Sequence, residues 1–320
     1  KVNNTNRILS RIAGLIKKSR TVFISGHLRP DGDTVGSQLA LASLLKKLKK
    51  CPFICNADPI PRNLRFLPNV QSIKIAGKCA KKFDLAIILE CSDVCRMGNI
   101  IDIKSQASFT INIDHHLSHS NFADVNYVDK NVSSSAELVW NIFNYLGFEP
   151  SYEEALCLYT GILTDTGCFQ HSNTNHRVLQ IASKLMSKGV KADWLYERIY
   201  QQRPLSASRF MGFVLNNFKL YLNNKVALFV LPKNEYANCL KDSEEIISYL
   251  MMTDSVKVGI FVRQIGDEVR ASFRSKGPVN VAKVAESFGG GGHRNAAGLS
   301  MYHPMEKSIQ MIMKEVKKAL

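Results

Sequence analysis

The sequence predicts an α/β fold in two domains: an N-terminal domain on a largely parallel sheet flanked by helices, and a smaller C-terminal α+β domain. At 320 residues the chain exceeds the length at which one hydrophobic core usually stops growing. In its first half, short apolar runs alternate with helical stretches, a pattern typical of parallel sheets. After Pro204 closely spaced strands are predicted instead. We therefore place the first domain at 1–188, a helical connector at 189–205 and the second domain at 206–320.

The strands and helices of the first domain are predicted from the spacing of apolar residues and from helix-capping patterns. Strands are predicted at 21–25, 85–89 and 109–113. From Val35 apolar residues recur at helical spacing, which predicts the first helix. Further helices are predicted at 134–145, which opens with a capping-box pattern, and at 152–163, 175–188 and 194–200.

The second domain combines predicted strands and helices. The strands are 213–222, 225–231, 256–264 and 268–274, and the helices are 279–287 and 304–319. Asn223-Asn224 between the first two strands is a credible hairpin turn.

The composition indicates a basic protein outside the membrane. The net charge of +15 suits anionic partners such as nucleotides or nucleic acid, with a merely solvated basic surface as the equal alternative. No apolar run reaches the 18 or more residues of a membrane span. Residues 1–6 lack a signal-peptide core, and the start at Lys1 rather than methionine suggests a trimmed chain. The 8 cysteines are interpreted as reduced thiols, so we expect a cytoplasmic protein.

Histidines and carboxylates gather where predicted strands or helices end. The clusters are His27 to Asp33, then Glu90, then Asp114-His115-His116, and finally Asp165. Three of them follow strands, and ligands of parallel sheets bind beyond the carboxyl ends of the strands. Mixed imidazole and carboxylate ligands favour Mn²⁺ over Ca²⁺, with Mg²⁺ or Co²⁺ as alternatives. Two such ions would share a hydroxide for attack on phosphorus.

The second domain carries a predicted phosphate-binding region. Four consecutive glycines, Gly289 to Gly292, expose backbone N–H groups suited to an anion, followed by an expected helix start at Ala296-Ala297. Alternate residues of the strand at 268–274 share one side and supply arginines for bidentate phosphate binding. The expected substrate-binding residues are Arg270, Ser272, Arg274, Gly290, Gly291, Gly292, His293 and Arg294.

Together these residues resemble the DHH phosphoesterase superfamily, in the DHH–DHHA1 group that includes the NrnA-type oligoribonuclease/pAp phosphatases. The resemblance spans nearly the whole chain. Its motifs are His27-x3-Asp31-x-Asp33, Gly36-Ser37-Gln38, Glu90, Asp114-His115-His116, Thr164-Asp165-Thr166-Gly167 and Gly289-Gly290-Gly291-Gly292-His293-x2-Ala296-Ala297-Gly298.

The resemblance implies roles for these residues. Six are expected as metal ligands: His27 and Asp31 on one ion, Asp33, His115 and Asp165 on the other, and Glu90 bridging both. His116 would contact the scissile phosphate or assist the leaving group, and Asp114 would orient a histidine; with Asp33 they are the expected catalytic residues. The bridging position is usually Asp in this family, so Asp93 is the alternative to Glu90.

The implied activity is that of a Mn²⁺-dependent phosphodiesterase. We expect exonucleolytic hydrolysis of short RNA, from two to about five nucleotides, to mononucleotides in a cleft between the domains, and removal of the 3′-phosphate of pAp. One alternative is a phosphodiesterase of cyclic di-AMP or pApA. Another is a nucleotide-binding protein whose chemistry Glu90 has weakened. The family resemblance also suggests a homodimer formed through the first domain.

Overall fold

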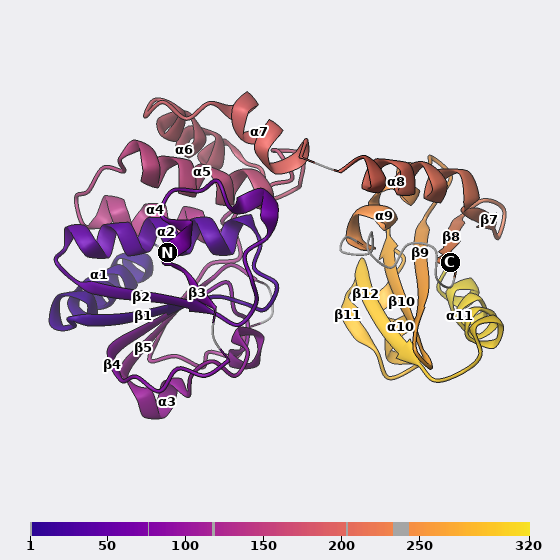
Figure 1. The fold of residues 1–320 in the computed structure, drawn as a ribbon, viewed down its shortest axis with the longest axis horizontal. Coiled ribbons are helices and arrows are strands. Elements are labelled where there is room, and N and C mark those ends of the chain that lie inside the picture. Colours follow the sequence, from indigo (N-terminus) through magenta and orange to yellow (C-terminus); the bar gives the residue numbers. More distant parts are fainter. Residues whose placement is uncertain (1, 76, 117–118, 203, 233–242) are drawn as a thin grey trace. The chain divides into compact units, whose positions relative to one another are not determined.

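The computed structural model describes residues 2–75, 77–116, 119–202, 204–232 and 243–320. The chain divides into two compact units, Lys1–Gln202 and Arg203–Leu320 (Figure 1). The expected connector, 189–205, contains helix α7 (Ala192–Tyr200), which buries Leu195 and Ile199 in the core of the first unit.

The sheet of the first unit is entirely parallel, as predicted. Its order is β3 (Lys74–Ile75), β2 (Cys51–Asn56), β1 (Thr21–Ser25), β4 (Phe83–Leu89), β5 (Ala107–Asp114) and β6 (Val125–Val128). The three predicted strands are β1, β4 and β5 at its centre. Ile24 of β1 is buried on one face and Phe23 on the other, so the middle of the strand carries apolar residues on both faces.

Helices and short segments cover the two faces of this sheet (Figure 1). The larger core contains residues of α1 (Val2–Lys18), α2 (Gly32–Lys47), α4 (Ser135–Tyr145), α5 (Tyr152–Asp165), α6 (His176–Met186) and α7. The smaller core, on the other face, lies under the 3-10 helix η3 (Val94–Met97) and α3 (Ile103–Gln106). Short 3-10 turns η1 (Arg62–Leu64) and η2 (Val70–Ser72) link β2 to β3.

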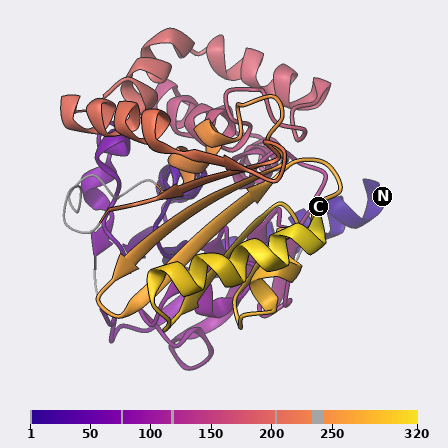
Figure 2. The ribbon, with the colours of Figure 1, turned by 90° about the vertical axis from the view of Figure 1, so that its right-hand side faces the viewer.

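The second unit has a mixed sheet with a core on each face (Figure 2). Its order is β11 (Gly291–His293), β12 (Ala296–Met301), β10 (Glu268–Ser275), β9 (Val258–Ile265), β8 (Val226–Val230) and β7 (Lys219–Tyr221). β8 and β9 pair in parallel, and the other strand pairs in the described part of this sheet are antiparallel. Helices α10 (Val281–Glu286) and α11 (Met305–Ala319) border one core, and α8 (Leu205–Asn217) and α9 (Ser243–Leu250) the other.

Two predictions for the second unit were wrong. The strand expected at 213–222 is helix α8 up to Asn217, and only 219–221 pair as a strand. Phe210 and Val214, four residues apart, are buried on one side of this helix, so tertiary packing decided the structure of this short apolar run. The helix start expected at Ala296 is strand β12. The predicted hairpin turn at Asn223-Asn224 is confirmed between β7 and β8.

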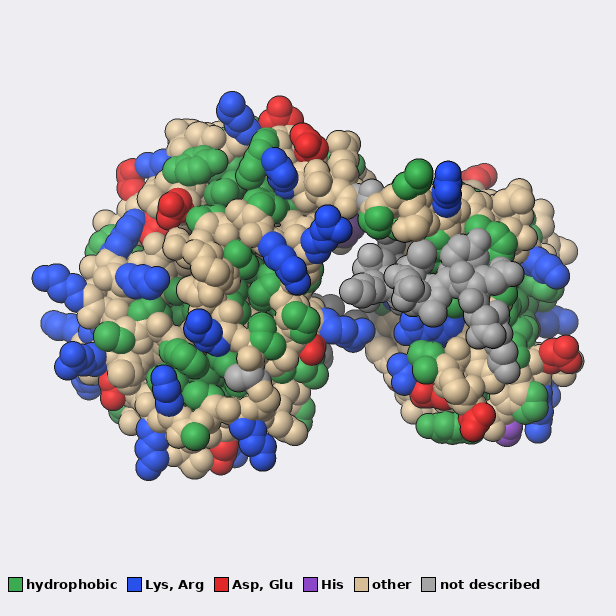
Figure 3. Space-filling model, in the orientation of Figure 1, with side chains coloured by type: hydrophobic (Ala, Val, Ile, Leu, Met, Phe, Trp, Pro, Cys, Tyr) green, Lys and Arg blue, Asp and Glu red, His purple; other side chains and the backbone are tan. Residues whose placement is uncertain are grey.

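On the face of the first unit that Figure 3 shows, basic side chains are scattered rather than gathered in one track. On the face shown in Figure 3, Lys and Arg side chains of the first unit are separated by apolar and neutral surface. None of the helices in the described part of the chain has both the length and the apolar composition needed to cross a membrane.

Candidate metal centre

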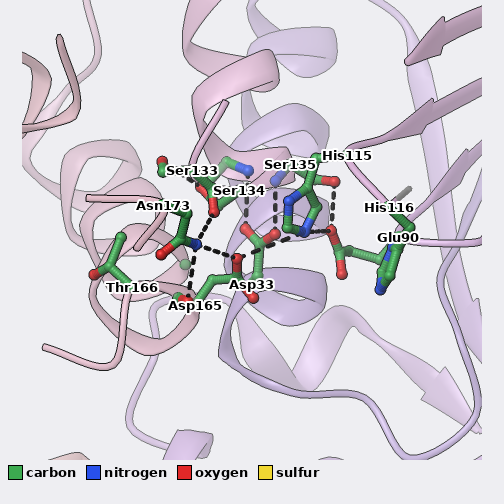
Figure 4. Close-up of polar contacts among 12 residues, drawn as sticks. Asp33, Glu90, His115, His116, Ser133, Ser134, Ser135, Asp165, Thr166 and Asn173 are labelled. Atoms are coloured by element: carbon green, nitrogen blue, oxygen red, sulfur yellow. Dashed lines mark hydrogen bonds and ion pairs between the residues drawn. The ribbon is translucent and has the colours of Figure 1, made fainter. Parts of the chain in front are cut away.

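The predicted ligands of the first unit meet at the carboxyl ends of three parallel strands. His27 lies two residues beyond β1, Glu90 directly follows β4, and Asp114 is the last residue of β5. Because the three strands are paired in parallel, these ends lie at one edge of the sheet. His115 and His116 continue from β5 into the same region (Figure 4).

Two helices supply the remaining carboxylates. Asp33 lies in the first turn of α2, and Asp165 is the last residue of α5. The helices approach closely because glycines line their contact. A Cβ at Gly161 would lie 2.6 Å from Asp33 Oδ1, and one at Gly36 would lie 2.3 Å from the backbone oxygen of Cys157. Glycine at both positions therefore allows the packing that brings Asp33 and Asp165 into one cluster (Figure 4).

His115 lies between two carboxylates. Its Nε2 is 3.1 Å from Glu90 Oε1 and 3.5 Å from Asp165 Oδ2. This nitrogen is buried and makes no well-aligned hydrogen bond, so both contacts are ion-pair contacts. Glu90, His115 and His116 offer ligand atoms that all lie within 4.8 Å of one another. These three residues have the spacing needed to hold a metal ion.

A second group of three residues shares Glu90. His27, Asp31 and Glu90 also present ligand atoms within 4.8 Å of one another. His27 Nδ1 is 2.7 Å from the backbone oxygen of Leu28, so in the neutral ring Nδ1 carries the proton and Nε2 presents a lone pair. That Nε2 is 3.6 Å from Asp31 Oδ2. The other oxygen of Asp31 accepts the N–H of Thr34 and caps α2.

Asp33 is fully buried and is held by the N-terminus of α4. Its Oδ2 accepts the backbone N–H of Ser135 over 2.7 Å, and its Oδ1 accepts that of Ala136 over 2.8 Å. The hydroxyl of Ser37 lies 3.2 Å from Oδ1. Burial, followed by repulsion from Glu90, raises the pKa of Asp33 well above its usual range. Its ionised form is therefore favoured only when positive charge is nearby.

The same crowding of charges shifts the pKa of neighbouring groups. Burial raises the pKa of Asp165 to about 7, opposed by His115 and reinforced by Glu90. Burial disfavours the charged form of His115, but the contact with Glu90 outweighs it and raises the pKa to about 9. Burial also opposes ionisation of Glu90, and the contact with His115 reverses that balance and lowers the pKa. A buried set with this excess of carboxylates attracts cations.

The donor set fits divalent cations that take both nitrogen and oxygen ligands. The lone pair of His27 Nε2 and the oxygen of Asp31 face each other at 3.6 Å, which a cation between them would make favourable. Nε2 of His115 is also buried and has no hydrogen bond, so a cation beside it would be favourable as well. Two groups that share one carboxylate have the pattern of a paired-ion site, and their imidazole and carboxylate donors suit Mn²⁺, Co²⁺ or Mg²⁺.

His116 is oriented by Asp114. Its Nδ1 is 2.6 Å from Asp114 Oδ1, and the same oxygen accepts the backbone N–H groups of His115 and His116. Burial disfavours the charged imidazole, but the bond to Asp114 outweighs it and raises the pKa of His116. The contact fixes the orientation of the His116 ring. It leaves Nε2 of His116 as the nitrogen available to an ion or a substrate.

Glu90, rather than Asp93, belongs to the carboxylate cluster. The side chain of Asp93 accepts the N–H of Cys95 over 2.8 Å as the N-cap of η3, and it is absent from both metal-ligand groups found among the described residues. Glu90 is 2% exposed and has a φ of 60°, a left-handed conformation that is uncommon for a residue other than glycine. The structure therefore favours Glu90, at the end of β4, over Asp93 as the carboxylate shared by the two ligand groups.

Two polar residues beside the cluster were not predicted as site residues. Ser135 donates its hydroxyl to Glu90 Oε1 over 2.6 Å, and Asn173 donates from Nδ2 to Asp165 Oδ2 over 3.2 Å (Figure 4). The sequence had marked Ser135 only as part of a helix-capping pattern. Asn173 follows Asp165 in an irregular segment and gave no signal of its own.

The predicted substrate-binding residues of the second unit lie around β10 and the β11–β12 hairpin. Arg270, Ser272 and Arg274 alternate along β10 and share one side, as predicted. Arg270 is paired with Glu268, whose Oε2 lies 2.8 Å from Arg270 Nε. Arg294 is exposed and donates to the backbone oxygen of Pro278.

The glycine run differs from the predicted loop before a helix. Gly291 and Gly292 belong to the short strand β11, which pairs with β12. A Cβ at Gly290 would lie 2.4 Å from the oxygen of Gly298, and one at Gly292 would lie 2.4 Å from that of Ala296. These glycines allow close strand pairing, and the predicted helix start after them is wrong because Ala296 begins strand β12. The side chain of His293 lies outside the described part of the structure.

Comparison with known proteins gives matches along most of the chain. Residues 21–162 match the family described as "DHH family, N-terminal domain", and residues 223–320 match the "DHHA1 domain". The chain is 33% identical over 303 residues to the bifunctional oligoribonuclease and PAP phosphatase NrnA of Thermus thermophilus, covering 93% of this chain and 91% of that protein. It is 25% identical over 288 residues to the protein of the same name from Bacillus subtilis, covering 88% and 90% respectively.

A solved structure shows the same fold over nearly its whole length. The crystal structure of an exopolyphosphatase-related protein from Bacteroides fragilis has a TM-score of 0.90 to this chain and 28% sequence identity. The match covers 98% of this chain and 96% of that one. The likeness therefore includes both units.

Proposed function

Because the chain belongs to the DHH family and carries its DHHA1 domain, we propose that it is a divalent-metal-dependent phosphoesterase that degrades short RNA. Its substrates would be oligonucleotides of two to about five residues, cut from one end to mononucleotides. Conversion of pAp to AMP and phosphate is the second proposed activity, since two similar proteins are named for both. The observation that carries the proposal is the pair of metal-ligand groups joined by Glu90.

We assign the ligands from the roles that the family resemblance implies, under which His116 faces the substrate although its ligand atoms lie within 4.8 Å of those of Glu90 and His115. His27 and Asp31 would hold one ion, and Glu90 would lie between the two ions. The second ion would be held by Asp33, His115 and Asp165. Mn²⁺ is the ion we expect, because imidazole nitrogen is less suited to Mg²⁺. When bound, paired ions supply charge neutralisation and an activated water for attack on phosphorus.

His116 is proposed to act on the substrate. Its bond to Asp114 fixes the ring and favours the protonated form, so Nε2 can contact the scissile phosphate or donate a proton to the leaving oxygen. Asp114 is buried and accepts three hydrogen bonds with one oxygen, which makes it an orienting group. Two backbone N–H groups hold the carboxylate of Asp33, so that its position stays the same when the charge of the site changes.

The second unit is proposed to bind a phosphate of the substrate through one side of β10. Arg274 and Ser272 share this side, and guanidinium groups bind phosphate in bidentate fashion. Arg270 would contribute less because Glu268 already pairs with it. Homodimerisation through the first unit is a proposal based on the family resemblance, and a cytoplasmic location is a proposal based on the interpretation of the 8 cysteines as reduced thiols. Light scattering after size-exclusion chromatography tests the first of these.

The test is hydrolysis of a substrate panel with Mn²⁺. The panel contains pApA, a five-nucleotide RNA, a 24-nucleotide RNA, cyclic di-AMP and pAp, with the Asp114→Ala/His115→Ala double variant as the inactive control. Rapid loss of the short RNAs by the wild type alone supports the proposal, and pAp turnover supports the phosphatase activity. Cleavage of cyclic di-AMP alone would favour a signalling phosphodiesterase. Nucleotide binding without any turnover would favour a binding protein.

A further inference from the structure

Ser135 contacts two carboxylates of the candidate metal centre at once. It is the first residue of α4 and is completely buried. Its hydroxyl donates to Glu90 Oε1 over 2.6 Å, and its backbone N–H donates to Asp33 Oδ2 over 2.7 Å (Figure 4). These two carboxylates come from β4 and α2, so Ser135 links three elements at the centre of the cluster.

We propose that Ser135 is a positioning residue that fixes the carboxylate of Glu90 for metal binding. The inference rests on the proposed function and assigns a residue that acts through Glu90. Glutamate has one more rotatable bond than aspartate, so its carboxylate needs a second contact to stay in one place. Glu90 Oε1 receives that contact from Ser135, while His115 Nε2 lies 3.1 Å from the same oxygen.

The neighbouring serines are engaged elsewhere. Ser133 donates its hydroxyl to Glu137 Oε2 over 2.9 Å, and the hydroxyl of Ser134 accepts the backbone N–H of Glu137 as the N-cap of α4. All three serines are completely buried. Only the hydroxyl of Ser135 has a hydrogen bond to a candidate metal ligand among these three. Ser133→Ala is therefore a matched control that removes a buried hydroxyl from the same turn.

The test is a double-mutant cycle on Mn²⁺ affinity, measured by isothermal titration calorimetry without substrate. The variants are Ser135→Ala, Glu90→Asp and the double variant, beside wild type and Ser133→Ala. Ser135→Ala keeps the backbone bond to Asp33 and should weaken Mn²⁺ binding by about 10-fold to 100-fold. Ser133→Ala should change the affinity by less than about twofold, although its unfolding temperature falls.

The comparison that decides the test is the effect of Ser135→Ala in a protein that already carries Glu90→Asp. Aspartate is shorter by one methylene, about 1.5 Å, and so cannot reach the hydroxyl of Ser135. Ser135→Ala should then have no further effect on Mn²⁺ affinity. Additive effects, an unchanged affinity in Ser135→Ala alone, or a wild type that binds no Mn²⁺ would each overturn the inference. RNA hydrolysis is measured separately, so a coupled Mn²⁺ site in a protein inactive on RNA would refute only the proposed activity.

Discussion

Asn173 donates hydrogen bonds to Asp165 at two places, over 3.2 Å to the carboxylate Oδ2 and over 3.1 Å to the backbone oxygen. The same Nδ2 is 2.8 Å from the backbone oxygen of Ser133. Asn173 therefore ties the end of α5 to the turn that precedes α4, next to the N–H groups that hold Asp33. A residue outside the predicted ligand set therefore connects the helix that supplies Asp165 to the turn whose following N–H groups hold Asp33.

Asn173→Ala should weaken Mn²⁺ binding by about tenfold, because the carboxylate of Asp165 loses the donor that orients it. Calorimetric titration with Mn²⁺ measures this change. Asn131→Ala is the control, since Asn131 is exposed and bonds only Asp129 among the described contacts. Equal Mn²⁺ affinities of the two variants would show that Asn173 does not position the ligand.

Asp165→Asn should have opposite effects with and without metal. At pH 8 wild-type Asp165 is ionised, since burial raises its pKa only to about 7, and it repels Glu90. Removing that charge should raise the unfolding temperature of the metal-free protein. It should also abolish the further rise that Mn²⁺ gives the wild type, because a ligand is lost. Thermal unfolding in EDTA and in Mn²⁺ measures both, with Glu197→Gln on the exposed side of α7 as the control. If the metal-free variant is less stable than the metal-free wild type, the charge of Asp165 does not destabilise the cluster.

Glu154→Gln should make stability less dependent on pH. Glu154 is 1% exposed, and although burial opposes its ionisation, bonds from Lys47, Ser151 and Ser43 lower its pKa. A lowered pKa in the folded state stabilises the fold above the ordinary value of 4.5, and this contribution is lost as the pH falls below it. The variant should therefore lose about 1–2 kcal/mol at pH 7, with Lys47 partly exposed, and progressively less as the pH falls from 4.5 through the lowered pKa of Glu154.

The control for that variant is Glu149→Gln. Glu149 also lies 2.5 Å from a lysine, Lys188, but it is 85% exposed. Denaturant unfolding from pH 3 to 8 should show no measurable change in its midpoint, because water screens an exposed pair. If both variants lose the same stability, burial does not set the strength of the Lys47–Glu154 pair.

Gly161→Ala should disrupt the metal centre, whereas Gly14→Ala should not. A Cβ at Gly161 would lie 2.6 Å from Asp33 Oδ1 and 2.7 Å from Ala136 Cβ, so α2, α4 and α5 must move apart. Gly14, in α1, has open space around its Cβ position, and alanine there should stabilise the helix by about 0.5–1 kcal/mol. Thermal unfolding and Mn²⁺ titration distinguish the two. Unchanged Mn²⁺ affinity in Gly161→Ala would mean that the helices can separate without moving Asp33.

Arg274→Ala should raise the KM for a dinucleotide by about tenfold and leave kcat nearly unchanged, because it removes a charged contact to a phosphate that does not react. Arg270→Ala should have a smaller effect, since Arg270 is already engaged by Glu268. Steady-state kinetics with pApA measures both variants. A KM that neither substitution changes would exclude this side of β10 from substrate binding.

Much of the first unit could be predicted from short-range patterns. The apolar runs of β1, β4 and β5 are long enough to identify buried strands, and parallel pairing then places His27, Glu90 and Asp114 at one edge. Asp33 and Asp165 were also singled out as members of acidic clusters, and the resemblance to the DHH–DHHA1 group assigned them to an ion. Prediction failed where a short segment depended on its neighbours. Residues 213–217 are helical because Phe210 and Val214 pack together into one core.

Local patterns in the chain were enough to predict the parallel sheet, the order of its ligands along the chain and the chemistry of their donors. The packing of the elements was needed to show that Glu90 rather than Asp93 lies in the cluster and that Gly291 and Gly292 pair as a strand. The tertiary structure also showed that Ser135 and Asn173 donate hydrogen bonds to Glu90 and Asp165. The partners of Ser135 are 45 and 102 residues away in the chain. Hydrogen bonds over such separations depend on how α2, α4 and β4 pack, and no local pattern of residues encodes that packing.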